Sequence, residues 1–273
     1  MTNTTYQPDE IEDKFGVIRR CGSMPSKPPA DSGLVAFSSM FKLWTDDECR
    51  RAIAAKRWTA EKYFPGEGEE NQGSHGSCNG YALANAAWRA AYAGGNKKLG
   101  KLSGSYAYSL MNGGRDQGSM LYDGFKVGQQ YGLPSLASCG WDKIYRSQTQ
   151  QDDAEAAQFK VVDPLLIHTW DELITAWAGP FFTVVAVQVG RNFERLNGDV
   201  LGIDQGPGNH AVCQSDSRLN SRGEIQGKVI MNWGLQHGVR GCGWIGYEHV
   251  RETMKYHQVY AIPIGQHGSG TVK

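Results

Sequence analysis

The chain has 273 residues, and its 28 basic and 28 acidic side chains give a formal net charge of zero. This balance argues against a protein that is drawn as a whole onto nucleic acid or an anionic membrane. Hydrophobic residues form 40% of the sequence, enough for the core of one large domain or two closely packed lobes. No stretch approaches the ~20 apolar residues of a membrane span, and residues 1–11 lack the apolar region of a signal peptide. We therefore expect no membrane or nucleic-acid partner and no secretion signal.

The N-terminal part of the chain is predicted to be an extension with one inserted helix. Residues 1–37 are expected to form a loop-rich arm because Pro25, Pro28 and Pro29 oppose regular helix. Residues 45–48 read Thr-Asp-Asp-Glu, which is a capping-box pattern and predicts a helix to about Tyr63. Two interpretations of residues 38–64 stay open: a helix packed on the surface, or a segment that covers the functional site.

A glycine-rich turn at residues 71–78, Asn-Gln-Gly-Ser-His-Gly-Ser-Cys, leads into a run of small residues that predicts a helix beginning at Cys78. A helix N-terminus presents unsatisfied N–H groups and a partial positive charge, which favour the reactive thiolate form of cysteine. The glycines allow the backbone to approach a substrate carbonyl closely, so the Cys78 N–H and the Gln72 side chain are candidate oxyanion donors. This one turn predicts a nucleophile and an oxyanion hole.

The rest of the chain changes from helical to strand-rich. Helices are predicted at residues 121–131 and around 170–177, with a polar, helix-permissive crossing between them at 146–160. Apolar, β-rich runs bounded by turn residues predict strands at 181–189, 210–213, 228–231 and 258–264. The pattern indicates the α+β class.

Residues 71–78 resemble the active-site segment of the papain-like cysteine proteases, peptidase family C1. His210, in Gly-Asn-His-Ala-Val, is similar to the catalytic histidine of that family, and the Asn-Trp-Gly at 232–234 resembles the segment that orients it. These residues follow Cys78 by about 130 and 150 residues, which is the spacing of this family. The resemblance implies a two-lobe α+β fold. Its left lobe would be helical with a central nucleophile helix, and its right lobe an antiparallel, β-barrel-like structure.

The resemblance also implies a domain organisation. Residues 1–70 would be an N-terminal extension with the inserted helix, residues 71–265 the papain-like catalytic domain, and residues 266–273 a C-terminal tail. Within the domain, the left lobe would span about 71–150 and the right lobe about 160–265. The short N-terminal region looks more like that of bacterial or phage-encoded relatives than of lysosomal ones. We therefore expect a cytoplasmic or virion-associated location, with association with a larger protein assembly as one hypothesis.

The activity that the resemblance implies is that of a cysteine-type endopeptidase. Cys78 and His210 would act as a thiolate and imidazolium pair, and His210 would donate its proton to the leaving amine as an acyl-enzyme forms. Gln72 would help to hold the oxyanion, and an Asn232 carbonyl would fix the histidine tautomer. The candidate substrate-binding residues are Gly118, Ser119 and Asn209, which would contact an extended polypeptide, although Gly118-Ser119 is also compatible with a plain turn.

Two positions depart from the family pattern. Asn79 replaces the tryptophan that follows the nucleophile in the family, and Asn232 lies directly before Trp233 instead of two residues before it. An ungapped match puts Met231 at the orienting position, and a shift of one residue along a strand turns a side chain to the other face. Either a compensating deletion restores Asn232 to the family position, or the triad is reduced to a dyad.

The remaining histidines and cysteines predict no metal and no cofactor. His75 stands where secreted members of the family carry a bridged cysteine, so it is interpreted as a turn residue that fills this space, with a second base or a metal ligand as alternatives. No H-E-x-x-H or C-x-x-C pattern occurs, and no glycine-rich stretch carries the lysine of a phosphate loop. The other five cysteines are expected to be free thiols in a protein of reducing origin.

Two other functions stay open. One is a catalytically silent papain-like protein that serves as a binding or structural subunit, which the shifted Asn232 and the unusual Asn79 favour. The other keeps the chemistry but changes the substrate, to that of an amidase or a transpeptidase. Retention of Cys78, His210 and Gln72 favours the enzymes.

Overall fold

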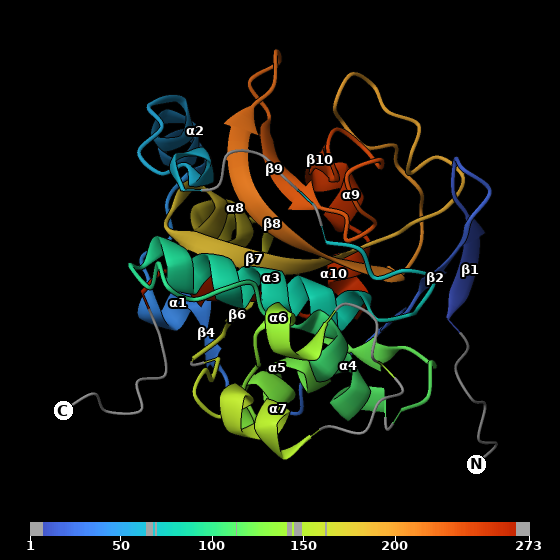
Figure 1. Cartoon of the computed structure of the whole chain (residues 1–273). Helices are drawn as coiled ribbons and strands as arrows, with labels where there is room; N and C mark the ends of the chain where they lie inside the picture. Colours follow the sequence, from blue (N-terminus) through green and yellow to red (C-terminus); the bar gives the residue numbers. More distant parts are fainter. Residues whose placement is uncertain are drawn as a thin grey trace.

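Helix α3 (Cys78–Ala93) runs through the middle of the molecule and separates a sheet from a layer of helices (Figure 1). The structure, a computed structural model, describes residues 8–63, 68, 70–112, 114–140, 144, 149–161 and 163–265. The helices below α3 in Figure 1 are α4 (Gly104–Asn112), α5 (Leu121–Gln130), α6 (Leu136–Cys139) and α7 (Gln150–Ala156). A Cβ atom on Gly80 would lie 2.2 Å from the carbonyl oxygen of Gly104. Glycine is therefore required where α3 meets α4.

The sheet that packs on α3 has seven strands in the order β10-β9-β8-β7-β11-β6-β4. Their bounds are β4 (Val35–Ala36), β6 (Leu165–Ile167), β7 (Phe181–Val187), β8 (His210–Leu219), β9 (Ile225–Ile230), β10 (Cys242–Ile245) and β11 (Val259–Pro263). Neighbouring strands are antiparallel except for β4 and β6, which are parallel. Within the described ranges no pairing joins β10 to β4, so the right lobe is an open sheet. The mixed α+β class is as predicted, but the barrel-like closure is not found.

The sheet buries both faces because helices cover each of them. Alanines of α3 pack against Val184, Ala186 and Ala211 on one face, since small side chains let a helix approach a sheet closely. On the other face, α8 (Trp170–Ala178) packs with α2 (Asp46–Ala54) against residues such as Val185 and Val212. The register between β7 and β8 places Val187 opposite His210. The sheet thereby fixes His210 at one end of its central hairpin.

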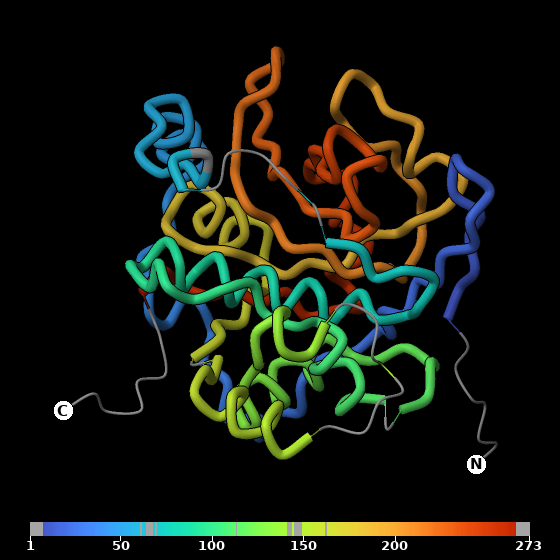
Figure 2. Tube along the Cα trace, viewed as in Figure 1, coloured from blue at the N-terminus to red at the C-terminus, as the bar shows by residue number. Residues whose placement is uncertain are grey.

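The predicted N-terminal arm is more ordered than its prolines suggest. Strands β1 (Asp9–Glu12) and β2 (Ile18–Cys21) form a hairpin, and β3 (Ser23–Met24) pairs in parallel with β5 (Ser119–Met120) of the left lobe. Figure 2 follows this blue trace from the hairpin at the right edge toward the right-hand end of α3. The segment then continues through β4 to α1 (Phe37–Met40).

The inserted helix is shorter than predicted. The capping box at Thr45 and Glu48 is confirmed, but α2 ends at Ala54, and Lys56 adopts a left-handed conformation with φ of 46°. A short 3-10 helix, η1 (Ala60–Lys62), follows. Because α2 packs on α8, the described part of residues 38–64 is a surface element and does not cover the site.

Two short helices, α9 (Tyr247–Val250) and α10 (Thr253–Tyr256), complete the fold. No helix within the described ranges is both long and apolar enough to cross a membrane. The predicted C-terminal tail at residues 266–273 lies outside the described residues.

Candidate active site

Cys78 is the first residue of α3, as the sequence predicts, and its side chain is fully buried. Burial raises the pKa of the Cys78 thiol to about 11 because a thiolate would lose its water, although the backbone N–H groups of Ala211 and Gly22 partly oppose this effect. The thiol is therefore protonated at neutral pH in this structure. The position at a helix start does not by itself produce a thiolate.

His210 begins β8 and is also fully buried. Its Nε2 atom lies 2.9 Å from the carbonyl oxygen of Met231, so Nε2 carries a proton and donates it to this acceptor. Nδ1 has no hydrogen-bond partner among the residues that the structure describes. Burial lowers the pKa of His210 to about 4, against the opposing effect of the Met231 carbonyl. At neutral pH the ring is neutral, with Nδ1 as its free base.

The side chain of Asn232 does not contact His210, which corrects the prediction that its carbonyl orients the imidazole. Its Oδ1 accepts a hydrogen bond of 2.9 Å from Nδ2 of Asn85, and its Nδ2 donates one of 3.3 Å to the carbonyl of Ala211. Asn232 has a left-handed backbone with φ of 61°. Asn232 lies beyond the end of β9, where its carboxamide bonds to Asn85 of α3, and the acceptor next to His210 Nε2 is the backbone carbonyl of Met231.

Gln72 is buried beside Cys78, and its Nε2 atom already has two acceptors. It donates to the carbonyl of His75 at 2.7 Å and to the carbonyl of Arg20, in the N-terminal segment, at 3.2 Å. Two backbone carbonyls of the same chain therefore occupy the side-chain amide of the residue that the sequence predicts as an oxyanion donor.

Residues 20–23 lie between two walls, and we call the space that they fill the cleft. On one wall, the N–H of Ser119 donates to the carbonyl of Gly22 at 2.8 Å. On the other, the N–H of Ser23 donates to the carbonyl of Asn209 at 2.8 Å. A Cβ atom on Gly118 would lie 2.6 Å from the Gly22 oxygen. All three predicted substrate-binding residues therefore face one extended backbone.

The chain was compared with known proteins. No protein-family model and no curated protein sequence matches it. Xylellain, a cysteine protease from Xylella fastidiosa, is similar in structure with a TM-score of 0.67 at 17% identity, over 96% of this chain and 100% of its own. The chain has a papain-like fold. Procathepsin B from Trypanosoma congolense is similar with a TM-score of 0.64 at 14% identity, over 88% of this chain and 86% of its own. The bromelain protease from Ananas comosus, in complex with the E64 inhibitor, is similar with a TM-score of 0.61 at 17% identity, over 77% of this chain and 98% of its own.

An ionic cluster around Asp116 holds one side of this papain-like cleft. Its carboxylate accepts from the Gly76 N–H at 2.8 Å, from the Tyr108 hydroxyl at 2.9 Å and from Arg20 at 3.0 Å, and lies 3.4 Å from Nδ1 of His75. Burial by itself would raise the pKa of Asp116, but these hydrogen bonds lower it to about 2. His75 therefore lies against the Asp116 carboxylate at this side of the cleft.

Asn79 has a polar role in this papain-like site. Its Nδ2 atom donates to the carbonyl of Ser119 at 2.5 Å and lies 3.0 Å from the Ser119 hydroxyl. It therefore ties the start of α3 to the wall that holds the N-terminal segment. Sequence reasoning did not assign this contact, nor the roles of Asp116 and Asn85, because each depends on partners far along the chain.

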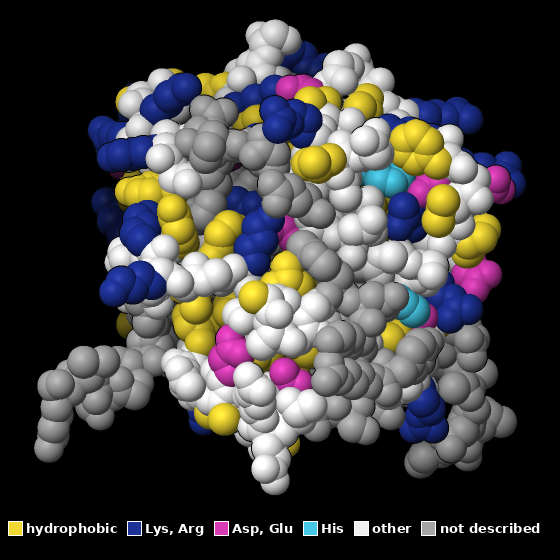
Figure 3. Space-filling view, viewed as in Figure 1, with side chains coloured by type: hydrophobic (Ala, Val, Ile, Leu, Met, Phe, Trp, Pro, Cys, Tyr) yellow, Lys and Arg dark blue, Asp and Glu magenta, His cyan; other side chains and the backbone are white. Residues whose placement is uncertain are grey.

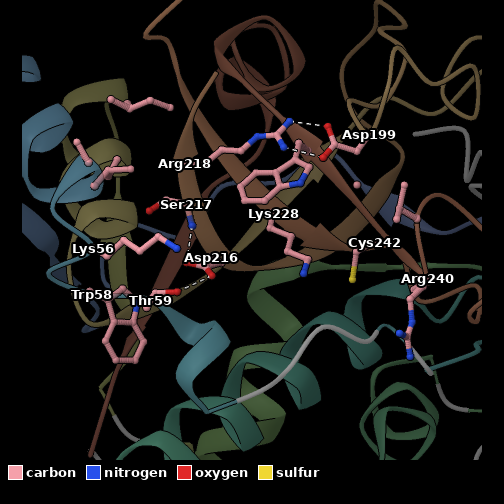
Figure 4. A pocket seen from close by; sticks show the side chains of 16 residues that line it. Lys56, Trp58, Thr59, Asp199, Asp216, Ser217, Arg218, Lys228, Arg240 and Cys242 are labelled. Atoms are coloured by element: carbon pink, nitrogen blue, oxygen red, sulfur yellow. Dashed lines mark hydrogen bonds and ion pairs between the residues drawn. The ribbon is translucent and has the colours of Figure 1, made fainter. Parts of the chain in front are cut away.

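A cavity with a volume of about 710 Å³ lies away from this site and is lined by β8, β9, β10 and residues 53–59 (Figure 4). Lys228 points into it, and Arg218 forms a bidentate pair with Asp199 above it. Many basic side chains lie over the upper half of the face in Figure 3, where this lobe is. Neither Cys78 nor His210 lines the cavity, and the described residues contain no group of three or more side chains that could hold a metal.

Proposed function

We propose that the chain is a cysteine-type peptidase that hydrolyses peptide bonds in an extended polypeptide. One observation carries the proposal: the backbone of residues 20–23 lies extended across Gln72, Ser119 and Asn209, beside the buried thiol of Cys78. A surface that pairs with both sides of its own main chain is suited to bind another main chain in the same way. Substrate backbone would take the place of this segment.

In the uncovered cleft, water would return to the two buried groups, and the pKa of Cys78 would fall as that of His210 rises. The thiol proton would pass to Nδ1 of His210, and the sulfur would attack the scissile carbonyl. Gln72 and the Cys78 N–H would hold the oxyanion. Nδ1–H would then protonate the leaving amine, and water would hydrolyse the acyl-enzyme.

We further propose that the form described is latent because residues 20–23 exclude substrate. A Cβ atom on Gly22 would lie only 2.0 Å from the carbonyl oxygen of Gly76, so a larger side chain cannot remain there without displacing the segment. Gly22→Val should therefore uncover the cleft without changing a catalytic group. Gly100→Ala is the matched control, because a Cβ atom at Gly100 meets no atom within 4 Å.

The experiment is intact-mass analysis and peptide mapping after incubation with an epoxysuccinyl peptide inhibitor. We expect slow labelling of the wild type and of Gly100→Ala, and labelling of Cys78 at least ten-fold faster in Gly22→Val. Labelling should be lost in the Gly22→Val background when Cys78→Ala or His210→Ala is added. Circular dichroism would confirm that each variant is folded.

Two other functions are distinguished by the same experiment. A folded Gly22→Val protein that binds peptides but leaves Cys78 unlabelled would overturn the peptidase proposal in favour of a silent binding subunit. If Cys78 is labelled but peptides are not cut, products formed with added amines would indicate a transpeptidase. The cytoplasmic or virion-associated location and the larger assembly remain predictions.

A further inference from the structure

Asn232 lies at the junction of the three parts that make the candidate site. Its carbonyl accepts from the Gln72 N–H at 2.8 Å, its Nδ2 donates to the carbonyl of Ala211, the neighbour of His210, and its Oδ1 is held by Asn85 of α3. Asn232 is fully buried, and Asn85 is buried as well. One side chain and its backbone thus connect the oxyanion donor, the strand that carries the histidine and the nucleophile helix.

The conformation of this residue decides what faces His210. With φ of 61°, Asn232 adopts a conformation that asparagine tolerates better than most side chains. The preceding carbonyl, that of Met231, lies 2.9 Å from Nε2 of His210. Trp233, the following residue, lies over the ring with a centroid distance of 4.9 Å. The left-handed turn therefore presents a carbonyl and an indole to the same imidazole.

We propose that Asn232 and Asn85 form a positioning pair that fixes the tautomer of His210 through the backbone carbonyl of Met231. The carboxamide bridge to α3 keeps the left-handed turn in place, and the turn directs the carbonyl at Nε2. Nδ1 then stays unprotonated and available to the thiol. The inference rests on the role proposed above for His210, and it assigns the orienting acceptor to the main chain.

The test is nuclear magnetic resonance of the full chain with ¹⁵N-labelled histidine at neutral pH. We expect His210 as one neutral tautomer protonated at Nε2, with a slowly exchanging Nε2–H. Asn232→Gly removes the carboxamide at a residue type that adopts the left-handed backbone without steric strain, and Asn85→Ala removes the donor to that carboxamide. Each should speed exchange of the Nε2–H at least ten-fold. The double variant should add less than two-fold, because both changes break the same bridge.

Asp163→Ala is the control for backbone strain, because Asp163 is another left-handed residue, with φ of 46°, and is exposed. It should leave the His210 signals unchanged. An Nδ1–H tautomer in the wild type, or unchanged exchange in folded Asn85→Ala and Asn232→Gly, would overturn the proposal. If Asn232→Gly does not fold, Asn85→Ala decides alone, since it removes the bridge to α3 without changing residue 232.

This measurement needs no turnover. A protein whose Cys78 is never labelled could still show the expected tautomer, and a labelled protein could show the other one. The two proposals therefore fail independently.

Discussion

The two walls of the cleft are held by different chemistry. On the side of the helical lobe, the Asp116 carboxylate gathers His75, Arg20, the Tyr108 hydroxyl and the Gly76 N–H. On the side of the sheet, a neutral His210 donates to the Met231 carbonyl beneath the Trp233 ring. The first wall is ionic and the second is neutral.

This difference shows two ways to hold a loop beside a nucleophile. A buried carboxylate with several donors tolerates some misalignment, because charge-assisted hydrogen bonds are strong, but it depends on pH. A neutral imidazole avoids the cost of a buried charge, but its single acceptor must be well placed. Each wall should therefore respond to acid in a separate range of pH.

We expect the largest loss in the free energy of unfolding when acid protonates His210 in the neutral wall. The pKa of His210 is lowered to about 4 from 6.5, so the folded form disfavours the proton, and its contribution to stability is present above pH 6.5 and lost as pH falls through about 4. The shift corresponds to a loss of about 3 kcal/mol in the free energy of unfolding. Urea unfolding of the wild type and His210→Gln between pH 7 and pH 4.5 measures it. If the free energy of unfolding fell equally with pH in the wild type and in His210→Gln, the lowered pKa would not belong to His210.

The ionic wall should lose stability at lower pH. The pKa of Asp116 is lowered to about 2 from 3.8, so its contribution is present above pH 3.8 and is lost as pH falls through about 2. Asp116→Asn should lower the free energy of unfolding at pH 7 by about 2 kcal/mol and flatten the acid response below pH 4. The control is Asp199→Asn, which breaks a half-exposed ion pair with Arg218. In this variant the free energy of unfolding, measured with urea, should change by less than about 1 kcal/mol. Equal losses in both variants would argue against a special role for Asp116.

The smallest effect should come from the contact that joins the segment to the ionic wall. Arg20 bonds to Asp116 and Glu10, and its side chain is 39% exposed, so water screens both pairs. Arg20→Ala should weaken the docking of the segment by less than about 1 kcal/mol. Labelling of Cys78 should then rise by no more than about five-fold. A rise as large as that of Gly22→Val would show that charge, not the close fit of Gly22, keeps the cleft covered.

Local signals explain what the sequence predicts well. The helix that begins at Cys78 follows from a glycine-rich turn and a run of small residues, and the start of α2 follows from the capping box at Thr45 and Glu48. Both signals lie within one or two turns of chain. Gln72 lies beside the nucleophile because the same turn carries both residues.

The remaining features depend on distant partners. The backbone carbonyl of Met231 accepts from Nε2 of His210, and no side-chain pattern indicates which carbonyl will be used. The covering segment is placed by two-residue strands, β3 and β5, which are too short to show a periodicity. Asp116 meets Gly76 across 40 residues of sequence. A closed barrel is not found in the described right lobe, because the order of strands in a sheet is a tertiary property that local patterns do not indicate.

The covering segment continues the hairpin of β1 and β2 and is covalently joined to the domain that it covers. A tethered segment competes with substrate at an effective concentration on the order of millimolar, whatever the concentration of the protein. Dilution will therefore not release it, and a weak substrate will not displace it. In the proposed peptidase, selection among peptides would begin with the strength of a competitor that is covalently attached.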